Sequence, residues 1–513
     1  MFRDRKIQTA ILLSLVVAGG IRLLYASWSV TDFWGDAYHH WLISRLTLAN
    51  DWVYADYKGL ETVWLPGFHY LIAGVMTVWG RFDLAPAHLT NMVLGTLACG
   101  LVAWLVAQVS RDWRAGLGAG LTLALIPWHI AYSHINMPEV LGGVLLLLSL
   151  LAARRGHAVW LAGLAFAGAL TRHELTLLLT PVGLWLGWRR EWRAALGLAL
   201  GAALGLGLWS LWSGHVTGEP LAWWSQYQAL TAWDARFWTE SGVRLADLAT
   251  LRGSADRAYP PLTLVVLLIL ASLIYRPWRR RVPSAGWLLI ALVGFHWLTL
   301  GLGFVAGNLP SADPRYVLVS LPALVAGGVV VLAAIPGRRL RLLVAGLYVA
   351  LLALSLYRQL PDFRDMAYVL APERAAGEYL GGVTPAGGHF WVDAPVAIYY
   401  SRLEPERFFS SDQLLPAAAR ESDRVPELAL SALLAHDVRF VLWEDVSYTF
   451  VQRVWPHMAA GQPFQQDGPE SARYRFEPVF HYAGWELDYG ARPTILWHIM
   501  LASGGGPISG LRR

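Results

Sequence analysis

Long apolar segments are the feature that most constrains what this chain can fold into. A membrane-spanning helix needs about 20 mostly apolar residues. Apolar residues make up 56% of the 513 residues and charged ones only 15%, whereas soluble proteins average about 45–50% and about 25%. This composition excludes a soluble multidomain protein, a disordered chain and a coiled coil. It predicts a polytopic helical membrane protein with about eleven spans, near residues 7–28, 86–108, 115–133, 137–153, 158–171, 174–188, 194–213, 259–275, 285–306, 316–335 and 340–358.

The charges predict an orientation in the membrane. The net charge of +5 comes from residues 1–359, which hold 28 basic and 17 acidic side chains, while residues 360–513 hold 13 and 19. If residues 65–80 form an interfacial or re-entrant helix and do not cross, the short arginine-rich loops all share one face. Basic loops are cytoplasmic in membrane proteins. We therefore expect a multi-pass protein of the plasma (inner) membrane with a cytoplasmic N-terminus, and no nucleic-acid partner.

This topology divides the chain into two domains. Residues 1–359 are expected to form the membrane domain, with long exoplasmic segments at 29–85 and 214–258. Residues 360–513 are expected to form a small exoplasmic α/β domain, because runs with strand character alternate with helical ones. The expected strands cover 388–393, 438–443, 476–482 and 494–500, and the expected helices cover 394–402 and 428–435. The single cysteine, Cys99, excludes a disulfide framework and a cysteine metal site.

The first candidate site lies in the first exoplasmic segment, directly after the first span. Asp36 is followed by Tyr38, His39 and His40, and helical spacing places both histidines on or near its face. A carboxylate here has the chemistry of a general base or of a ligand for a divalent cation. The alternative is that Asp36 caps an interfacial helix over 37–49, for which aspartate is well suited.

A second carboxylate, Glu139, follows Pro138 at the same expected face of the membrane. Proline is favoured at the first position of a helix, so Glu139 falls in a first turn, where a negative charge suits the helix dipole. Glu139 is therefore either a helix-stabilising acid or a second functional carboxylate.

Cations at exoplasmic helix ends form the third candidate group. They are Arg172, beside His173 and Glu174; Arg315, followed by Tyr316; and Lys58, one of two lysines in the chain. Arginine at an interface can simply extend its charged end into water. Two arginines at one face would also suit a phosphate or diphosphate headgroup.

The order of these features resembles the GT-C superfamily of polytopic glycosyltransferases, which use polyprenyl-phosphate sugars. The relatives in question are protein O-mannosyltransferase and aminoarabinose transferase. The resemblance covers residues 7–358. It rests on an Asp-bearing first loop, Trp64-Leu-Pro66, the turn from Ser133 to Pro138-Glu139, Leu170-Thr-Arg172 and the Arg-Tyr-x-Leu-x-x-Leu-Pro segment from Arg315 to Pro322.

The resemblance implies an enzyme that transfers a sugar from a polyprenyl-phosphate donor to an exoplasmic glycan, lipid or protein. It implies that the first-loop acid Asp36 is the base and that the cavity binds a lipid-phosphate donor from the exoplasmic side. From the residues themselves we expect Glu139 to be a second catalytic acid, and the donor phosphate to be bound by Arg172, Arg315, Tyr316 and Lys58. Asp36 is also the expected ligand if a divalent cation takes part. Relatives often carry two adjacent acids where this chain has Gly35-Asp36, and an aspartate where it has Glu139. The expected acceptor-binding or supporting residues are Tyr38, His39, His40, Glu61, His134, His173 and Glu174.

Other interpretations stay open. Asp36-Ala-Tyr-His-His also resembles the first-loop motif of oligosaccharyltransferase catalytic subunits, which hold a divalent cation. We interpret the similarity of Trp485–Gly490 to that family's Trp-Trp-Asp-Tyr-Gly motif as a coincidence. A lipid or sugar transporter would also have a polar cavity, but the polar residues here gather at one expected face, and the chain shows no repeated halves. A membrane scaffold that displays the C-terminal domain would not explain that gathering.

Overall fold

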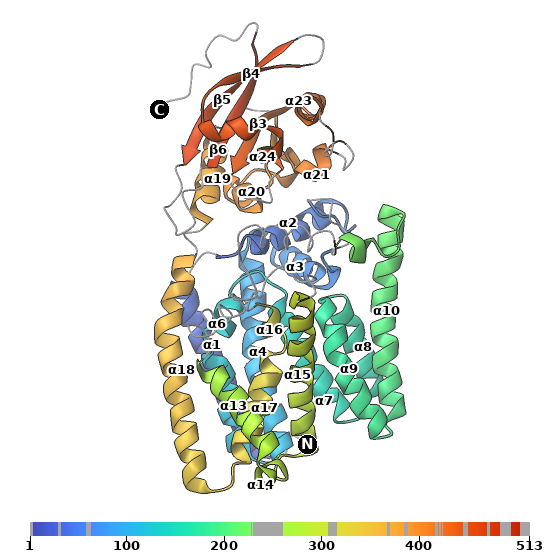
Figure 1. The fold of residues 1–513 in the computed structure, drawn as a ribbon, viewed down its shortest axis with the longest axis vertical. Helices are drawn as coiled ribbons and strands as arrows, with labels where there is room; N and C mark the ends of the chain where they lie inside the picture. Colours follow the sequence, from blue (N-terminus) through green and yellow to red (C-terminus); the bar gives the residue numbers. More distant parts are fainter. Residues whose placement is uncertain are drawn as a thin grey trace. The chain divides into compact units, whose positions relative to one another are not determined.

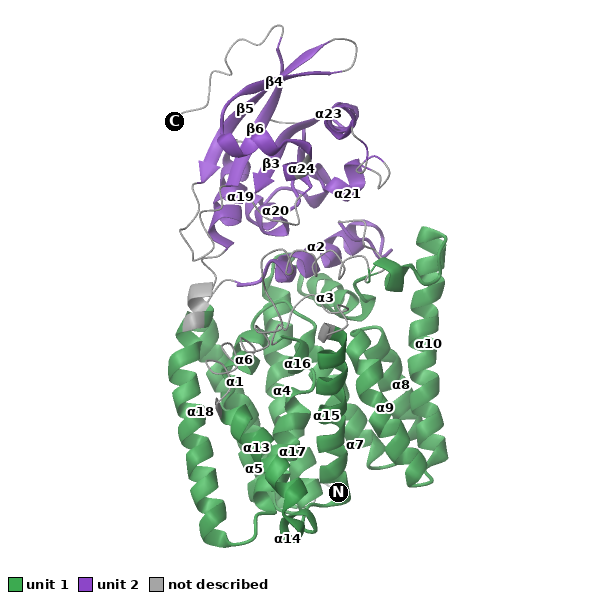
Figure 2. Cartoon of the chain, viewed as in Figure 1, with its two compact units in different colours: residues 1–31, 62–365 green, residues 32–61, 366–513 purple. Residues whose placement is uncertain are grey.

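The computed structural model divides the chain into two compact units, coloured separately in Figure 2. Unit 1 comprises Met1–Thr31 and Thr62–Asp365, and unit 2 comprises Asp32–Glu61 and Met366–Arg513. The sequence-based division assigns all of 29–85 to the membrane domain, whereas the structure groups Asp32–Glu61 with the C-terminal residues. The structure describes residues 4–28, 32–57, 63–226, 228, 260–305, 315–366, 370–383, 388–415, 419, 422, 424–444, 450–468, 472–482 and 494–502.

Unit 1 is a helical bundle (Figure 1). Among its described residues, five helices are long and apolar enough to cross a membrane, which agrees with a multi-pass membrane protein. They are α1 (Arg5–Trp28), α4 (Ala85–Ser110), α10 (Trp192–Thr217), α15 (Ser284–Val305) and α18 (Arg338–Met366). The other helices described in the bundle are α3 (Pro66–Trp79), α5 (Trp113–Leu125), α6 (Pro127–Tyr132), α7 (Glu139–Ala153), α8 (Ala158–Ala169), α9 (His173–Trp188), α13 (Pro260–Ile274), α14 (Arg276–Arg279), α16 (Arg315–Leu318) and α17 (Leu321–Ala333).

Each of the eleven expected spans contains a helix, but two of them are interrupted. The segment 115–133 was expected to be continuous, and it breaks between α5 and α6. Pro127 explains the break, because proline lacks an N–H group and excludes the preceding residue from helical geometry. The segment 316–335 is interrupted between α16 and α17, and Pro322 lies in the first turn of α17. Helix α3 has 14 residues, which at 1.5 Å per residue is shorter than the roughly 30 Å hydrocarbon core.

Glycines let α10 pack closely against α8. Gly197, Gly201 and Gly205 repeat every fourth residue and so lie on one face of α10. A Cβ atom at Gly201 would lie 2.0 Å from the carbonyl oxygen of Ala162, and one at Gly197 would lie 2.5 Å from that of Ala158. Small residues at such a stripe are typical of helix packing in membranes, where close van der Waals contact drives association.

Unit 2 is built on a six-stranded mixed sheet with strand order β2-β1-β3-β6-β5-β4. β1 pairs in parallel with β2 and β3, and the remaining pairs are antiparallel. The strands are β1 (His389–Trp391), β2 (Phe408–Phe409), β3 (Val438–Glu444), β4 (Phe464–Asp467), β5 (Arg473–Tyr482) and β6 (Thr494–Leu501). Each strand and helix expected in this region forms, and β2 and β4 are additional.

Helices cover this sheet, and its core is aromatic. Trp391, Trp455 and Trp497 are buried in it together with Phe476. Of the helices described in unit 2, α19 (Ala371–Val383), α23 (Val425–Ala435) and α24 (Val451–Val454) contact the strands. The others are α2 (Gly35–Ala49), α20 (Pro395–Ser401) and α21 (Ser411–Leu414). Helix α2, although it precedes most of the membrane bundle in sequence, packs on α20.

Candidate functional site

The predicted site residues lie in both units. Unit 2 holds Asp36, Tyr38, His39 and His40. Unit 1 holds Glu139, His134, Arg172, His173, Glu174, Arg315 and Tyr316. The remaining two, Lys58 and Glu61, lie outside the described residues.

In unit 1, Arg172 joins the two acids that the sequence singles out. Its Nη1 donates to Glu139 Oε1 at 2.8 Å, while its Nη2 and Nε donate to Glu174 at 2.7 and 3.2 Å. The side chain of Glu139 is fully buried, and those of Arg172 and Glu174 are 12% and 19% exposed. One guanidinium thus serves two carboxylates, so its charge is already balanced within this cluster.

Two helix N-termini, those of α7 and α9, produce this ion-pair cluster. Glu139 is the first residue of α7, and Glu174 lies in the first turn of α9, so each carboxylate is at a positive helix end. Arg172 is the extended residue before α9, with φ −151° and ψ 133°. The turn between α8 and α9, which the sequence marks by Leu170-Thr-Arg172, therefore places a cation between two helix N-termini.

Arg315 supplies a second cation to this cluster. It begins α16, its guanidinium lies 5.3 Å from the ring centre of Tyr316, and it interacts electrostatically with Glu139 and Arg172. Two arginines and two carboxylates therefore leave the cluster close to neutral.

His296 belongs to the same region, and sequence reasoning missed it. This buried histidine of α15 is hydrogen-bonded through Nδ1 to Ser320 Oγ at 2.8 Å, and its Nε2 has no hydrogen-bond partner among the described residues. Arg172 and Glu174 both act on it electrostatically. The sequence did carry a signal for His296: it is a single histidine within an apolar span. Polar groups inside a membrane are costly and usually functional.

The two predicted histidines of unit 1 have packing roles. His173 stacks on Trp223, with ring centres 4.9 Å apart and planes 15° apart. His134 stacks on His88 at 4.9 Å and meets Tyr25 edge-on at 5.6 Å. Both rings therefore pack against other aromatic rings of unit 1.

In unit 2, Asp36 is half-buried in the first turn of α2. The helix begins at Gly35 and its N-cap is Trp34, so the expectation that Asp36 caps a helix over 37–49 is wrong. The carboxylate still lies near the positive end of the helix dipole. His39 and His40 are both buried, and His39 Nε2 lies 2.7 Å from Asp56 Oδ1.

The segment after α2 is tied to the sheet of unit 2. The Tyr57 hydroxyl donates to the carbonyl of Val392, directly after β1, and Ser410 Oγ donates to the carbonyl of Tyr57 at 2.7 Å. Asp393 accepts hydrogen bonds from the backbone N–H and the hydroxyl of Ser411 at 2.7 and 2.5 Å. The two bonds of Tyr57 fix this residue at the carboxyl end of the parallel strand β1.

Tyr38 anchors α2 itself. Its hydroxyl lies 3.2 Å from that of Tyr400 and 3.4 Å from the Asp32 carbonyl. Burial raises the pKa of the Tyr38 phenol, and the negative charge of Asp32 raises it further. Burial likewise raises the pKa of Tyr57, with a smaller contribution from Asp393. Both phenols therefore keep their protons and act as hydrogen-bond donors.

Within the described part of the chain, no three His, Cys, Asp or Glu side chains come together in a way that could hold a metal ion. The segment Trp485–Gly490, similar to an oligosaccharyltransferase motif, lies outside the described residues.

Two solved membrane enzymes have the same fold as this chain. ArnT from Cupriavidus metallidurans, solved with undecaprenyl phosphate, superposes with a TM-score of 0.53 at 15% identity, over 97% of this chain and 99% of its own. The oligosaccharyltransferase of Archaeoglobus fulgidus, AglB, gives 0.54 at 13% identity in its apo form, over 86% of this chain and 70% of its own. The same enzyme with an inhibitory peptide and a dolichol-phosphate gives 0.53.

By sequence, the chain matches no protein-family model and none of the curated proteins. The likeness is therefore one of fold. ArnT and AglB are both GT-C polytopic glycosyltransferases, so the resemblance to the GT-C superfamily is confirmed at the level of the fold.

Proposed function

We propose that this protein is a membrane glycosyltransferase that moves a sugar from a polyprenyl-phosphate donor to an acceptor at the exoplasmic face. The observation that carries the proposal is the match to ArnT, which extends over 97% of this chain and 99% of that enzyme. ArnT was solved with undecaprenyl phosphate and AglB with a dolichol-phosphate. A carrier lipid ending in one phosphate is thus common to both neighbours.

In the proposed reaction, an acceptor oxygen or nitrogen attacks the anomeric carbon of the donor sugar. The bond between that carbon and the phosphate oxygen breaks, and its electron pair stays on the lipid phosphate. Asp36 takes the acceptor proton as general base. Its half-buried position in the first turn of α2 keeps the carboxylate accessible to an acceptor, and Tyr38 and His39 anchor the helix that carries it.

The leaving phosphate needs preorganised positive charge. We assign this role chiefly to Arg315 with Tyr316, because the guanidinium of Arg172 already serves Glu139 and Glu174. Arg172 would then organise the cluster and add its field, and Glu139 would position the reacting groups. Lys58 and Glu61 remain candidates for the phosphate and the acceptor.

We also propose the orientation expected from the charges, with the N-terminus in the cytoplasm of a bacterial-type inner membrane and unit 2 on the exoplasmic side. The reaction would then serve the cell envelope. Accessibility labelling of single cysteines in a Cys99→Ala background tests this orientation, because a cysteine placed in unit 2 should react with a membrane-impermeant reagent in intact cells.

The deciding experiment compares purified wild type with Asp36→Asn and Asp51→Asn across a panel of polyprenyl-phosphate sugars. Asp51 is a matched control, since it is an exposed aspartate just after α2 whose φ of 51° asparagine tolerates well. A true donor should raise the thermal unfolding temperature of all three proteins, while only wild type and Asp51→Asn release or transfer the sugar. Turnover by Asp36→Asn would remove Asp36 as the base. If no donor stabilises any of them, the donor class is wrong.

A further inference from the structure

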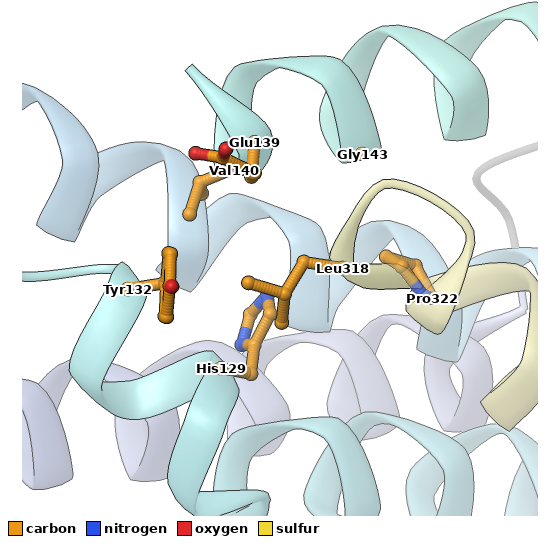
Figure 3. A pocket seen from close by; sticks show the side chains of 7 residues that line it. All are labelled: His129, Tyr132, Glu139, Val140, Gly143, Leu318 and Pro322. Carbon is orange, nitrogen blue, oxygen red and sulfur yellow. The ribbon is translucent and has the colours of Figure 1, made fainter. Parts of the chain in front are cut away.

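A small cavity in unit 1 is lined by Glu139, one of whose oxygens accepts a hydrogen bond from Arg172. Residues from α6, α7, α16 and α17 line it: His129, Tyr132, Glu139, Val140, Gly143, Leu318 and Pro322. Its volume is about 10 Å³ for the centre of a water-sized sphere, close to what one buried water needs. In Figure 3, His129 of α6 and Glu139 of α7 lie on opposite sides of the view, with Val140 and Leu318 between them and Tyr132 to one side.

Glu139 presents an unused acceptor to this cavity. Its side chain is fully buried, Oε1 accepts from Arg172, and Oε2 has no hydrogen-bond partner among the described residues. A buried carboxylate oxygen without a hydrogen bond costs about 1–3 kcal/mol or more. A polar ligand in the cavity would relieve this cost.

On the other side of the cavity, His129 is held by a buried arginine. Arg22 of α1 is 1% exposed, and its Nη2 lies 2.6 Å from His129 Nδ1. The other hydrogen bonds of Arg22 go to the carbonyl of Ala18 at 3.1 Å and to Cys99 Sγ at 3.8 Å. A cation in an apolar span is costly, and none of these three partners is an acid.

Chemistry fixes the tautomer of His129. A guanidinium stays protonated in proteins and only donates hydrogen bonds, so Nδ1 must accept from Arg22. The single ring proton of a neutral imidazole then sits on Nε2. The ring therefore offers an N–H donor on the side away from Arg22, while Glu139 offers an acceptor.

We propose that His129 Nε2–H and Glu139 Oε2 bind one water molecule in this cavity, so that Arg22 and His129 act as positioning residues for Glu139. The water would accept from His129 and donate to Glu139, which gives it the two or more polar partners that a buried water needs. Arg22 polarises the imidazole and so strengthens its donor. The buried positive charge in α1 is thereby coupled to the buried carboxylate that begins α7.

The surroundings of both groups fit this coupling. The ionisable groups that face Glu139 are Arg172, Glu174 and Arg315, together with His129 and Tyr132 at the cavity. Arg172 and Arg315 thus act on the carboxylate directly, and the Arg22–His129 pair would act on it through the cavity. Gly95 leaves room for Arg22 because it has no side chain. A Cβ atom at this position would lie 2.9 Å from Arg22 Nε and 2.1 Å from Ser133 Oγ.

Any effect of Arg22 and His129 on catalysis rests on the proposed function. The hydrogen bonds from Arg22 through His129 and the water to Glu139 can be measured without any turnover. The first measurement is ¹⁵N NMR of histidine-labelled wild type, with the His129 signals identified by their loss in His129→Gln. One protonated nitrogen, Nε2, and one hydrogen-bond-accepting nitrogen, Nδ1, are expected. A proton on Nδ1, or on both nitrogens, overturns the proposal, and this test needs only wild type and one conservative variant.

The second measurement is infrared difference spectroscopy of the Glu139 carboxylate, identified by comparison with Glu139→Gln. His129→Leu should shift this band, since leucine cannot bind the water, whereas the donor amide of His129→Gln should restore it. Cys99→Ala is the matched control, because it removes a contact of Arg22 without reaching the cavity. An unshifted band in folded His129→Leu overturns the proposal. If that variant does not fold, the NMR result on wild type decides.

The two proposals fail separately. A wild-type protein that transfers sugar but carries the proton on Nδ1 of His129 would keep the proposed function and lose this inference. The expected tautomer in a protein that acts on no donor would do the reverse. Under the proposed function, Arg22→Gln should lower kcat more than it changes the KM for donor, and Arg22→Lys, which still donates to His129, should recover most of the loss.

Discussion

The hydroxyl of Tyr57 donates a hydrogen bond to the backbone carbonyl of Val392, 335 residues later in the chain. Tyr57 is 1% exposed and follows the helix that carries Asp36, while Val392 directly follows β1 in the sheet of unit 2. In open α/β sheets, ligands bind outside the carboxyl ends of parallel strands. Here a part of the chain itself occupies such a position, and the segment that bears the proposed base is built into the C-terminal unit.

Removing this one hydroxyl should loosen the Asp36 segment. Tyr57→Phe keeps the ring but leaves the carbonyl of Val392 without its donor, which should cost about 1–2 kcal/mol of folding free energy. We expect a lower thermal unfolding temperature and faster hydrogen exchange over residues 36–57. Tyr357→Phe is the control, since that side chain is 81% exposed on α18. Equal exchange in the two variants would show that the bond does not hold the segment.

Unit 2 should lose stability in alkali. Burial raises the pKa of the Tyr57 and Tyr38 phenols in the folded protein, whereas tyrosine in an unfolded chain ionises near pH 10. This contribution is therefore fully present below about pH 10, and it is lost above it because only the unfolded state releases the protons. The loss should be about 1.4 kcal/mol per pH unit for each phenol.

The measurement is the unfolding temperature of the full chain between pH 9 and 11.5. Interference from amines is small, since Lys6 and Lys58 are the only two lysines. Tyr57→Phe should show a shallower decline than wild type, and a parallel decline would mean that Tyr57 ionises normally.

Local patterns were enough to predict most elements of the fold. Apolar length located the helices of the bundle, and strand patterning located β1, β3, β5 and β6. Pro138 correctly predicted that Glu139 lies in the first turn of a helix, although Pro138 itself is the N-cap and not the first helical residue. Leu170-Thr-Arg172 marked the turn that places Arg172 between the two acids.

Local sequence patterns did not predict the contacts between residues that are distant in the chain. The division at residue 359 follows chain order, but the packing of α2 on α20 is a tertiary relationship that no local pattern encodes. The sequence also did not reveal that Arg22 meets His129, or that His296 meets Ser320, because a single polar residue in an apolar run does not indicate its partner. The prediction that Asp36 is the N-cap of α2 was wrong for a similar reason. Asp36 has the stronger local preference for that position, but the helix begins after Trp34.

Replacing Arg172 should destabilise the protein more than replacing Glu139. Arg172→Gln removes the counter-charge that is hydrogen-bonded to the fully buried Glu139, and breaking a buried pair in this way costs about 3–5 kcal/mol. Glu139→Gln should cost only about 1 kcal/mol, because the amide oxygen still accepts and Arg172 keeps Glu174. Denaturation midpoints of the two variants test the order.

The double variant sharpens this test. Arg172→Gln with Glu139→Gln removes both charges of the buried pair, so it should be more stable than Arg172→Gln alone. A simple sum of the two single effects would mean that the pair is not coupled energetically.

The contact between α8 and α10 should depend on Gly201 and not on every glycine of α10. Gly201→Ala would place a methyl group 2.0 Å from the carbonyl oxygen of Ala162, so the helices must separate. Overpacking of this kind costs about 1–3 kcal/mol. Gly207→Ala is the matched control: a Cβ there meets nothing within 4 Å, and replacing glycine in a helix interior is favourable by up to about 1 kcal/mol. We therefore expect Gly201→Ala to lower the unfolding temperature in detergent and Gly207→Ala to maintain or raise it. If the two variants unfold at the same temperature, the glycine stripe does not determine how closely these helices pack.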